Sequence, residues 1–146
     1  KQQKTPQREI QQAVKLKTKN DDIVNAHLEL FEEISNEPDI VAIELIIDGQ
    51  NIRAKSENFF EALVDLRKEL EKRSMQILCN GTAEIVYPSP MQLSMGTGRV
   101  AYKQYLGQQA RMADVVDIFE CDESLCFVKI NEQSEYHKKW LQSIAE

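Results

Sequence analysis

Apolar side chains recur at two different spacings along this chain, and the spacings predict helices in some segments and strands in others. The stretch "SENFFEALVDLRKELEKRS" places apolar residues three and four positions apart, so one face is apolar and the opposite face is charged. This spacing predicts a helix over residues 57–73, with Ser56 as its cap. The apolar face would consist of Phe59, Phe60, Leu63, Leu66 and Leu70.

Two further segments show helical spacing. Asn20 has the character of an N-cap, and the two aspartates after it would lie in a first turn, where the helix dipole favours negative charge. The sequence therefore predicts a helix over 21–35, with apolar positions at Ile23, His27, Leu30, Phe31 and Ile34. A last helix is expected from Asn131 onward, with an apolar stripe of Tyr136, Trp140, Leu141 and Ile144.

Runs of β-branched and aromatic residues predict strands. Residues 40–48 ("IVAIELIID") and 51–55 ("NIRAK") flank a glycine and predict a hairpin. A second hairpin is expected across 75–87, because Asn80-Gly81 suits a type I′ turn. Further strands are expected within 99–106, 114–120 and 124–130. The predicted fold class is α+β, a single domain with a mainly antiparallel sheet and two to three packed helices.

The first 19 residues differ from the rest of the chain. They are polar, basic and rich in glutamine, and they predict an arm outside a single α+β domain of residues 20–146. A solvated tail or a loose helix is the simplest form of such an arm, and a tether to a membrane protein or an anionic surface is the alternative. The chain contains no run of ~18 apolar residues, so no membrane insertion is expected. No secretory signal is visible.

The charge of the chain is unevenly distributed. The net charge is −6, but residues 1–19 carry six basic side chains and one acidic one. The remaining residues therefore carry 12 basic and 23 acidic side chains, a net charge of −11. An acidic body repels the phosphates of nucleic acid and attracts basic proteins. The composition thus predicts a protein partner and no nucleic-acid partner.

Three cysteines are present, at positions 79, 121 and 126. An odd number of cysteines in a chain long enough to bury a core is typical of reduced thiols in the cytoplasm. Cys121 and Cys126 have no second pair at metal-ligand spacing, and the two histidines are far away in the sequence. We expect no metal site and no cofactor.

The stretch "MQLSMGTGRVAY", residues 91–102, contains two of the five glycines. A dinucleotide loop is excluded, because prolines interrupt the preceding segment and a strand rather than a helix follows. One interpretation is a structural crossing, in which Gly96 and Gly98 adopt positive φ and Arg99 is fixed by an acid such as Asp117. The other is a surface loop that presents Met91, Met95 and Arg99 to a partner.

No catalytic constellation emerges from the remaining polar residues. His27 lies on the apolar face of an expected helix, where a satisfied core histidine is the simplest interpretation, and His137 is expected to be a surface or partner contact. Asp114 and Asp117 flank an expected strand. Acidic residues in such positions usually lie at a solvent-exposed strand edge, and recognition of a partner is the alternative. The candidate partner-binding residues are therefore Met91, Met95, Arg99, Asp114 and Asp117, with no catalytic residue.

Several short motifs occur in order through the second half of the chain: "VYPSPM", "MGTGRVAY", "VVDIFE" and a terminal "YHKKWLQSI". Together with "SENFFEALVDLRKELE", they resemble a group of small bacterial proteins with VYPSGM-like, MGxGRxAY-like, VDIF and WL motifs. The resemblance covers residues 40–146. Where the group has glycine after "VYPS", this chain has Pro90, which stiffens the loop. The resemblance implies an immunity role against bacterial polymorphic toxins.

These expectations combine into one leading hypothesis and two alternatives. The leading hypothesis is a non-enzymatic, cytoplasmic protein-binding module, an immunity protein whose partner is a basic toxin domain. The first alternative is a small-ligand or nucleotide-binding protein or enzyme that uses residues 88–99, with a pocket lined by Arg99, Tyr87 and Tyr102. The second is an adaptor domain tethered to a membrane protein through the basic arm.

Overall fold

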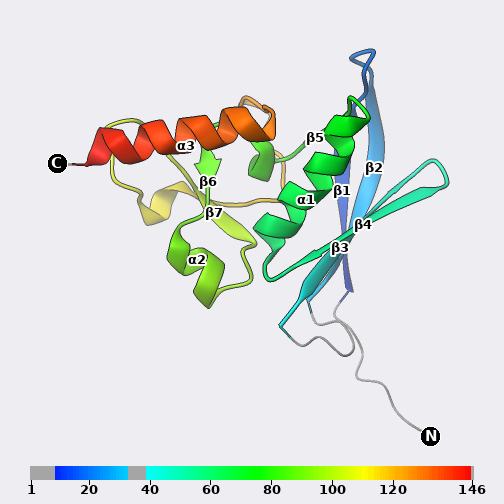
Figure 1. The fold of residues 1–146 in the computed structure, drawn as a ribbon, viewed down its shortest axis with the longest axis horizontal. Coiled ribbons are helices and arrows are strands. Elements are labelled where there is room, and N and C mark those ends of the chain that lie inside the picture. The colour runs from blue at the N-terminus through cyan, green and yellow to red at the C-terminus, as the bar shows by residue number, and fades with distance from the viewer. Residues whose placement is uncertain (1–8, 33–38, 146) are drawn as a thin grey trace, which may run out of the picture.

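The computed structural model describes residues 9–32 and 39–145. These residues form two antiparallel sheets, one of five strands and one of three, together with three α-helices (Figure 1). The predicted α+β class with a mainly antiparallel sheet is confirmed. No helix in the described part of the chain has the length and apolar character needed to cross a bilayer.

The five-stranded sheet has the order β4-β3-β2-β1-β5. Its strands are β1 (Glu9–Lys17), β2 (Ile23–Phe31), β3 (Val41–Ile47), β4 (Gln50–Ser56) and β5 (Gln76–Leu78). The predicted hairpin of β3 and β4 is confirmed, and Asp48 and Gly49 both have positive φ in its two-residue turn, as a type I′ turn requires. Alternate residues face the core, so that Leu16, Leu28 and Leu45 are fully buried.

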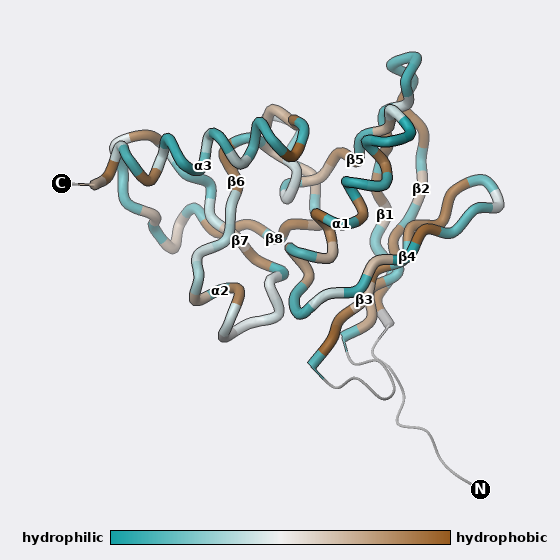
Figure 2. Tube along the Cα trace, viewed as in Figure 1, coloured by the Kyte–Doolittle hydropathy of each residue, from teal (hydrophilic) through white to brown (hydrophobic). Residues whose placement is uncertain are grey.

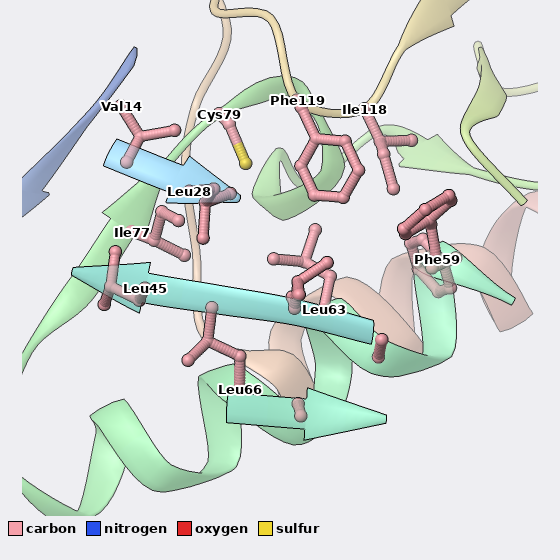
Figure 3. Packing of buried hydrophobic residues seen from close by; sticks show 14 of the residues in the cluster. Val14, Leu28, Leu45, Phe59, Leu63, Leu66, Ile77, Cys79, Ile118 and Phe119 are labelled. Atoms are coloured by element: carbon pink, nitrogen blue, oxygen red, sulfur yellow. The ribbon is translucent and has the colours of Figure 1, made fainter. Parts of the chain in front are cut away.

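Helix α1 (Phe59–Lys72) packs on one face of this sheet (Figure 1). Its predicted apolar face is buried, and Leu63 and Leu66 lie among side chains from the strands (Figure 3). Its cap is Asn58 rather than Ser56, because the Asn58 side chain accepts a hydrogen bond from the Glu61 amide at 2.8 Å. This is the N-cap geometry that satisfies a free donor of the first turn.

The rest of the chain builds the second sheet, β6-β7-β8, and the helices around it. The elements in order are the 3₁₀-turn Asn80–Thr82, β6 (Val86–Tyr87), α2 (Pro90–Met95), β7 (Val100–Lys103), the 3₁₀-turn Met112–Asp114, β8 (Val115–Asp117) and α3 (Ile130–Ile144). Helix α3 lies over β6, away from the five-stranded sheet (Figure 1). The predicted C-terminal helix and the strand after Arg99 are confirmed.

The expected helix over 21–35 is wrong, and so is the arm as far as residues 9–19 are concerned. Residues 9–17 form β1, which lies between β2 and β5, and residues 23–31 form β2. Val24, Ala26, Leu28 and Leu30 alternate along one face of β2, a period of two that the helical interpretation overlooked. Asn20 and its neighbours form the hairpin turn, in which Asp21 has φ of 65°. Residues 1–8 and 33–38 lie outside the described residues.

The expected hairpin across 75–87 is also wrong. Strands β5 and β6 belong to different sheets, and Asn80-Gly81 lies in a 3₁₀-turn between them. Gly81 is required by space rather than by φ, because a Cβ there would lie 2.6 Å from Leu63 Cδ2 and 2.9 Å from Ile118 Cβ. The expected strand over 124–130 is reduced to one bridge, which pairs Ala83 with Phe127.

Candidate partner-binding surface

The glycine loop predicted as a candidate site contains a short helix, α2, capped by Ser89. After α2 the chain docks onto the start of α1, where the Phe59 amide donates to the Thr97 carbonyl at 2.7 Å. Gly98 has φ of 76°, and a Cβ there would lie 2.7 Å from Asn58 Cβ. Positive φ is therefore found at Gly98, whereas Gly96 is extended with φ of −116°. The loop is a close crossing between α2 and α1.

Arg99 and Asp117 come together beside this crossing. Arg99 Nε donates to Asp117 Oδ2 at 3.0 Å, and the guanidinium lies 5.8 Å from the centre of the Phe119 ring. The other carboxylate oxygen of Asp117 accepts from the Phe119 amide at 2.8 Å. Both charged side chains are about three-quarters buried. The geometry matches the structural interpretation of Arg99, in which an acid on the neighbouring strand fixes it.

The other three predicted residues do not join this pair. Asp114 is buried and accepts from Arg111 Nε at 3.1 Å. Met91 is 69% exposed on α2. The backbone of Met95 ends α2, but its side chain lies outside the described part of the structure. Among the predicted residues, Met91 remains a candidate for direct contact with a partner.

Most of the exposed large apolar side chains belong to residues 91–141 of the chain. Seven large apolar residues are exposed among the described residues, and Ile23 is the one that precedes residue 91. Apart from Met91 and Ile23, these side chains belong to residues 100–112 and to α3, which packs against that segment: Val100, Tyr105, Leu106, Met112 and Leu141. We call these five residues the 100–112 surface. Met112 is 79% exposed, the highest value among the seven.

Helix α3 holds the middle of the 100–112 segment in place. The Tyr136 hydroxyl donates to the Gln104 carbonyl at 2.9 Å, and Trp140 Nε1 donates to the Gln108 carbonyl at 3.0 Å. The Gly107 amide donates to Ser143 Oγ at 2.8 Å. These three bonds fix residues 104–108 along α3, so the exposed side chains sit on an ordered backbone. Trp140 therefore anchors α3 to this loop.

His137 completes the contact between α3 and the second sheet. Its ring stacks on Tyr87 with centroids 3.8 Å apart, and its Nδ1 lies 3.0 Å from Gln104 Oε1. Burial lowers the pKa of His137, because desolvation disfavours the charged imidazolium. Tyr87 is thus engaged with His137 and Tyr102 with Met112, while Arg99 binds Asp117. The three residues predicted to line a ligand pocket have separate partners.

A buried polar network lies beneath these elements, and the sequence analysis did not identify it. Gln133 Nε2 donates to the carbonyls of Gly81, Ala83 and Val86 at 2.8–3.0 Å. Its Oε1 accepts from Arg67, which also donates to the Val128 carbonyl. Desolvation lowers the pKa of Arg67 to about 10. The network connects α1, α3 and the turn before β6 through side chains that are almost fully buried.

An acidic groove of about 610 Å³ borders α2 and the turn after it. Its lining includes the carboxylates of Glu32, Asp39 and Glu57, together with Leu93 and Thr97 from α2 and the turn after it. The groove places negative charge close to the helix that presents Met91.

The three cysteines differ in burial, and so in the reactivity of their thiols. Cys79 is buried, and burial raises the pKa of its thiol to about 12, whereas Cys121 and Cys126 are exposed free thiols. The described residues contain no group of three His, Cys, Asp or Glu side chains that could hold a metal ion.

No protein-family model matches this chain, and no curated protein matches it either. What bears on function is therefore the chain's own side chains and charges, together with the motifs of its sequence.

Proposed function

We propose that this protein is a non-enzymatic binding module that neutralises a basic bacterial toxin domain by binding it through the 100–112 surface. The observation that carries the proposal is the concentration of exposed apolar side chains on this segment and on α3. Large apolar side chains held in water on an ordered backbone are typical of protein–protein contact sites.

The side chains of this surface suit protein recognition. Methionine adapts to irregular partner surfaces, and tyrosine combines apolar area with a polar tip. Full burial of a Met or Leu side chain contributes about 1.5–3 kcal/mol. The backbone beneath Leu106 is already fixed by its bonds to α3, so little conformational entropy would be lost on binding.

The charge of the chain indicates the kind of partner. Residues 20–146 carry a net charge of −11, and the groove beside α2 gathers three carboxylates. A basic partner would be attracted to this acidic body, which increases the rate of encounter and discriminates against acidic proteins. Toxin domains that act on nucleic acids need basic surfaces, and an inhibitor that covers such a surface blocks access to the substrate. The immunity role itself rests on the resemblance of the sequence motifs.

The partner can be identified by co-purification from the native host with mass spectrometry, together with inspection of the neighbouring genes. The surface is then tested with Met112→Glu, which places a charge at the most exposed apolar position. We expect at least a tenfold loss of affinity for the partner, about 1.4 kcal/mol, with an unchanged melting temperature.

Ile23→Glu is the matched control, because Ile23 is an exposed apolar residue on β2, outside the surface. It should leave the affinity within about twofold of the parent protein. Equal losses in both variants, or no loss in Met112→Glu, would refute the assignment of this surface. If the variants and the parent bind a small ligand and no protein, the proposed function fails as a whole.

A further inference from the structure

The five-stranded sheet has two edges that differ in how they end. Strand β4 forms one edge along its whole length. At the other edge β5 is short and pairs only with residues 15–17 of β1, whereas β2 pairs with all of β1 (Figure 1). Residues 10–14 therefore have β2 on one side and no strand of the described part of the chain on the other. We call these five residues, "IQQAV", the free β1 edge.

The β1–β2 turn determines which backbone groups face this edge. The Thr18 amide donates to the Asp22 carbonyl at 2.9 Å, so Thr18 points its backbone groups at the β2 side. Backbone direction alternates along an antiparallel strand. The even-numbered residues of β1 therefore bond to β2, and the odd-numbered residues point away from it. This phase agrees with β5, which pairs with Lys15 and Lys17.

Gln11 and Ala13 are the odd-numbered residues of the free β1 edge. Both are exposed, and no backbone group among the described residues pairs with either of them on this side. The Ala13 carbonyl accepts one long bond, at 3.5 Å, from the side chain of Gln12. The edge thus presents backbone donors and acceptors to solvent in the spacing that another strand would match.

The side chains of the two edges also differ. Sheet edges are usually protected from pairing by charged residues, prolines or bulges, and β4 fits this rule with Arg53 and Lys55. The free β1 edge has no charged residue, proline or glycine. The lysines of β1 lie toward the β1–β2 turn, which is hydrophilic (Figure 2). An unprotected edge of this kind is suited to pair with a further strand.

The sequence of the free β1 edge is complementary to itself. Ile10 and Val14 face the core side of the sheet at its two ends, where Ile10 is half-buried and Val14 is 6% exposed. Antiparallel pairing of two copies about Gln12 places Ile10 of each copy opposite Val14 of the other, and Gln11 opposite Ala13. Apolar side chains then meet apolar ones, and no charged side chains of residues 10–14 meet.

The neighbouring registers fit less well. Pairing about Gln11 would place each Ile10 opposite Gln12, which separates the apolar side chains. Pairing about Ala13 would bring Gln11 opposite Lys15, a position that β5 already occupies. The register about Gln12 is therefore the one in which both the backbone and the side chains of two copies match.

We propose that two copies of this chain associate by antiparallel pairing of their free β1 edges about a two-fold axis at Gln12. Each Gln11–Ala13 pair would exchange two backbone hydrogen bonds, and the two five-stranded sheets would become one. Such a contact uses the same residues on both copies, so it closes as a dimer and leaves no further free β1 edge. The contact lies away from the 100–112 surface and does not depend on the proposed partner.

The strength of the contact follows from its size and from the charge of the chain. A short paired stretch buries little surface, which is typical of weak association. Each copy carries a net charge of −6, so two copies repel one another at low ionic strength. Dimerisation should therefore strengthen as salt screens this repulsion, whereas attraction to a basic partner should weaken.

The association is measured by sedimentation equilibrium of the full chain from about 10 μM to about 1 mM. We expect the average mass to rise from one chain toward two, and to rise more at about 0.5 M salt than at about 0.05 M salt. In the ¹⁵N-labelled chain, the amide signals of Gln11 and Ala13 should shift with concentration. Their exchange with solvent should slow over the same range.

Ala13→Pro tests the edge directly. The Ala13 amide points away from β2, so proline removes a donor of the free β1 edge and no bond of the β1–β2 ladder. We expect at least a tenfold weaker association with an unchanged melting temperature. The double variant Gln11→Lys/Ala13→Lys leaves the backbone intact and changes only exposed side chains. It places lysine opposite lysine in the dimer and should also weaken association at least tenfold.

Asn51→Pro is the matched control at the other edge. Ile47 and Gln50 close the β3–β4 hairpin, so the next amide, that of Asn51, points outward from β4. This variant should dimerise as the parent does. The mass of one chain at every concentration, or an equal loss in the two proline variants, would overturn the proposal. A dimer that only Asn51→Pro disrupts would assign the contact to β4. A monomer whose Gln11 and Ala13 amides shift only when another protein is added would assign the edge to that protein, and either result would overturn the proposal as well.

Discussion

The two sheets of this molecule are held to their helices by different interactions. The five-stranded sheet and α1 bury a continuous apolar cluster, in which Leu and Ile side chains from all five strands meet the apolar face of α1 (Figure 3). Residues 79–145 also contribute apolar side chains, but five of the seven buried polar or charged side chains of the described residues lie there: Asn80, Thr82, Gln104, Asp114 and Gln133. Burial of apolar area tolerates small displacements, whereas buried hydrogen bonds require fixed positions.

The difference has a functional consequence. Residues 79–145 bury hydrogen-bonded polar side chains and expose several large apolar ones to solvent. The five-stranded sheet and α1 instead bury mainly apolar side chains. Its side-chain hydrogen bonds keep residues 104–108 in place without using the apolar side chains of that segment for packing. Those side chains remain available to a partner.

The largest expected effect concerns Gln133. Replacement by Leu would remove a donor from three carbonyls, of which Ala83 keeps the Val86 amide, and would deprive buried Arg67 of an acceptor. Each unsatisfied buried group costs about 1–3 kcal/mol, so we expect a loss of about 4 kcal/mol in the free energy of unfolding, measured by chemical denaturation. Gln142→Leu makes the same change at an exposed position of α3 and should cost less than about 0.5 kcal/mol. A loss below about 1 kcal/mol in Gln133→Leu would show that packing, not the polar network, holds α3.

Trp140→Ala should be the next largest change. The indole is 7% exposed, and its Nε1 donates to the Gln108 carbonyl, so the variant loses both packing and a hydrogen bond. We expect a loss of about 3 kcal/mol, with release of residues 104–108 from α3. Denaturation curves give the stability, and amide exchange at residues 104–108 reports the release. A curve identical to that of the parent protein would contradict the role of Trp140 as the anchor of this segment.

Local periodicity explains which elements could be predicted from the sequence. Helices α1 and α3 and the β3–β4 hairpin carry their own signals, including Asp48-Gly49 at the turn. Strands β1 and β2 were missed, because glutamines and lysines obscure the alternation of Val14 and Leu16, and because Asn20 and its aspartates suit a turn as well as a cap. The turn at Gly81 could not be predicted, since its shape depends on distant contacts with Leu63 and Ile118.

The candidate site was predictable only in part. The pair Arg99–Asp117 was among the alternatives, because both residues adjoin expected strands. The exposure of Leu106 and Met112 has no local signal, since an apolar residue in an irregular segment can be buried or exposed. Arg67 did carry a signal: it is a charged residue on the apolar face of α1, four positions after Leu63, and such a placement indicates a buried polar partner.

Arg99→Ala should destabilise the protein less than Gln133→Leu or Trp140→Ala. The variant removes the ion pair with Asp117 and the contact with the Phe119 ring, both partly buried. We expect a loss of about 1 kcal/mol in stability, and partner affinity within about twofold of the parent value. Melting temperature and partner affinity are measured on the same preparation. A tenfold loss of affinity with an unchanged melting temperature would instead make Arg99 a contact residue.

The smallest effect is a dependence of stability on pH through His137. Burial lowers its pKa in the folded state, so between that pKa and the ordinary value near 6.5 the unfolded chain binds more protons than the folded one. The contribution of neutral His137 is fully present above pH 6.5 and decreases as the pH falls through this window. Unfolding free energies at pH 7.5 and 5.5 should therefore differ more in the parent protein than in His137→Asn. An equal difference in the two proteins would exclude His137 as the origin.

The most direct test of the central claim is hydrogen–deuterium exchange of the chain alone and in complex with its partner. If the 100–112 surface is the contact site, the partner should slow exchange at residues 100–112 and 136–144. It should leave the amides of β1 to β4 as they are in the free chain. Slowed exchange confined to the outer face of the five-stranded sheet, with residues 100–112 unchanged, would contradict the assignment of the partner to the C-terminal part.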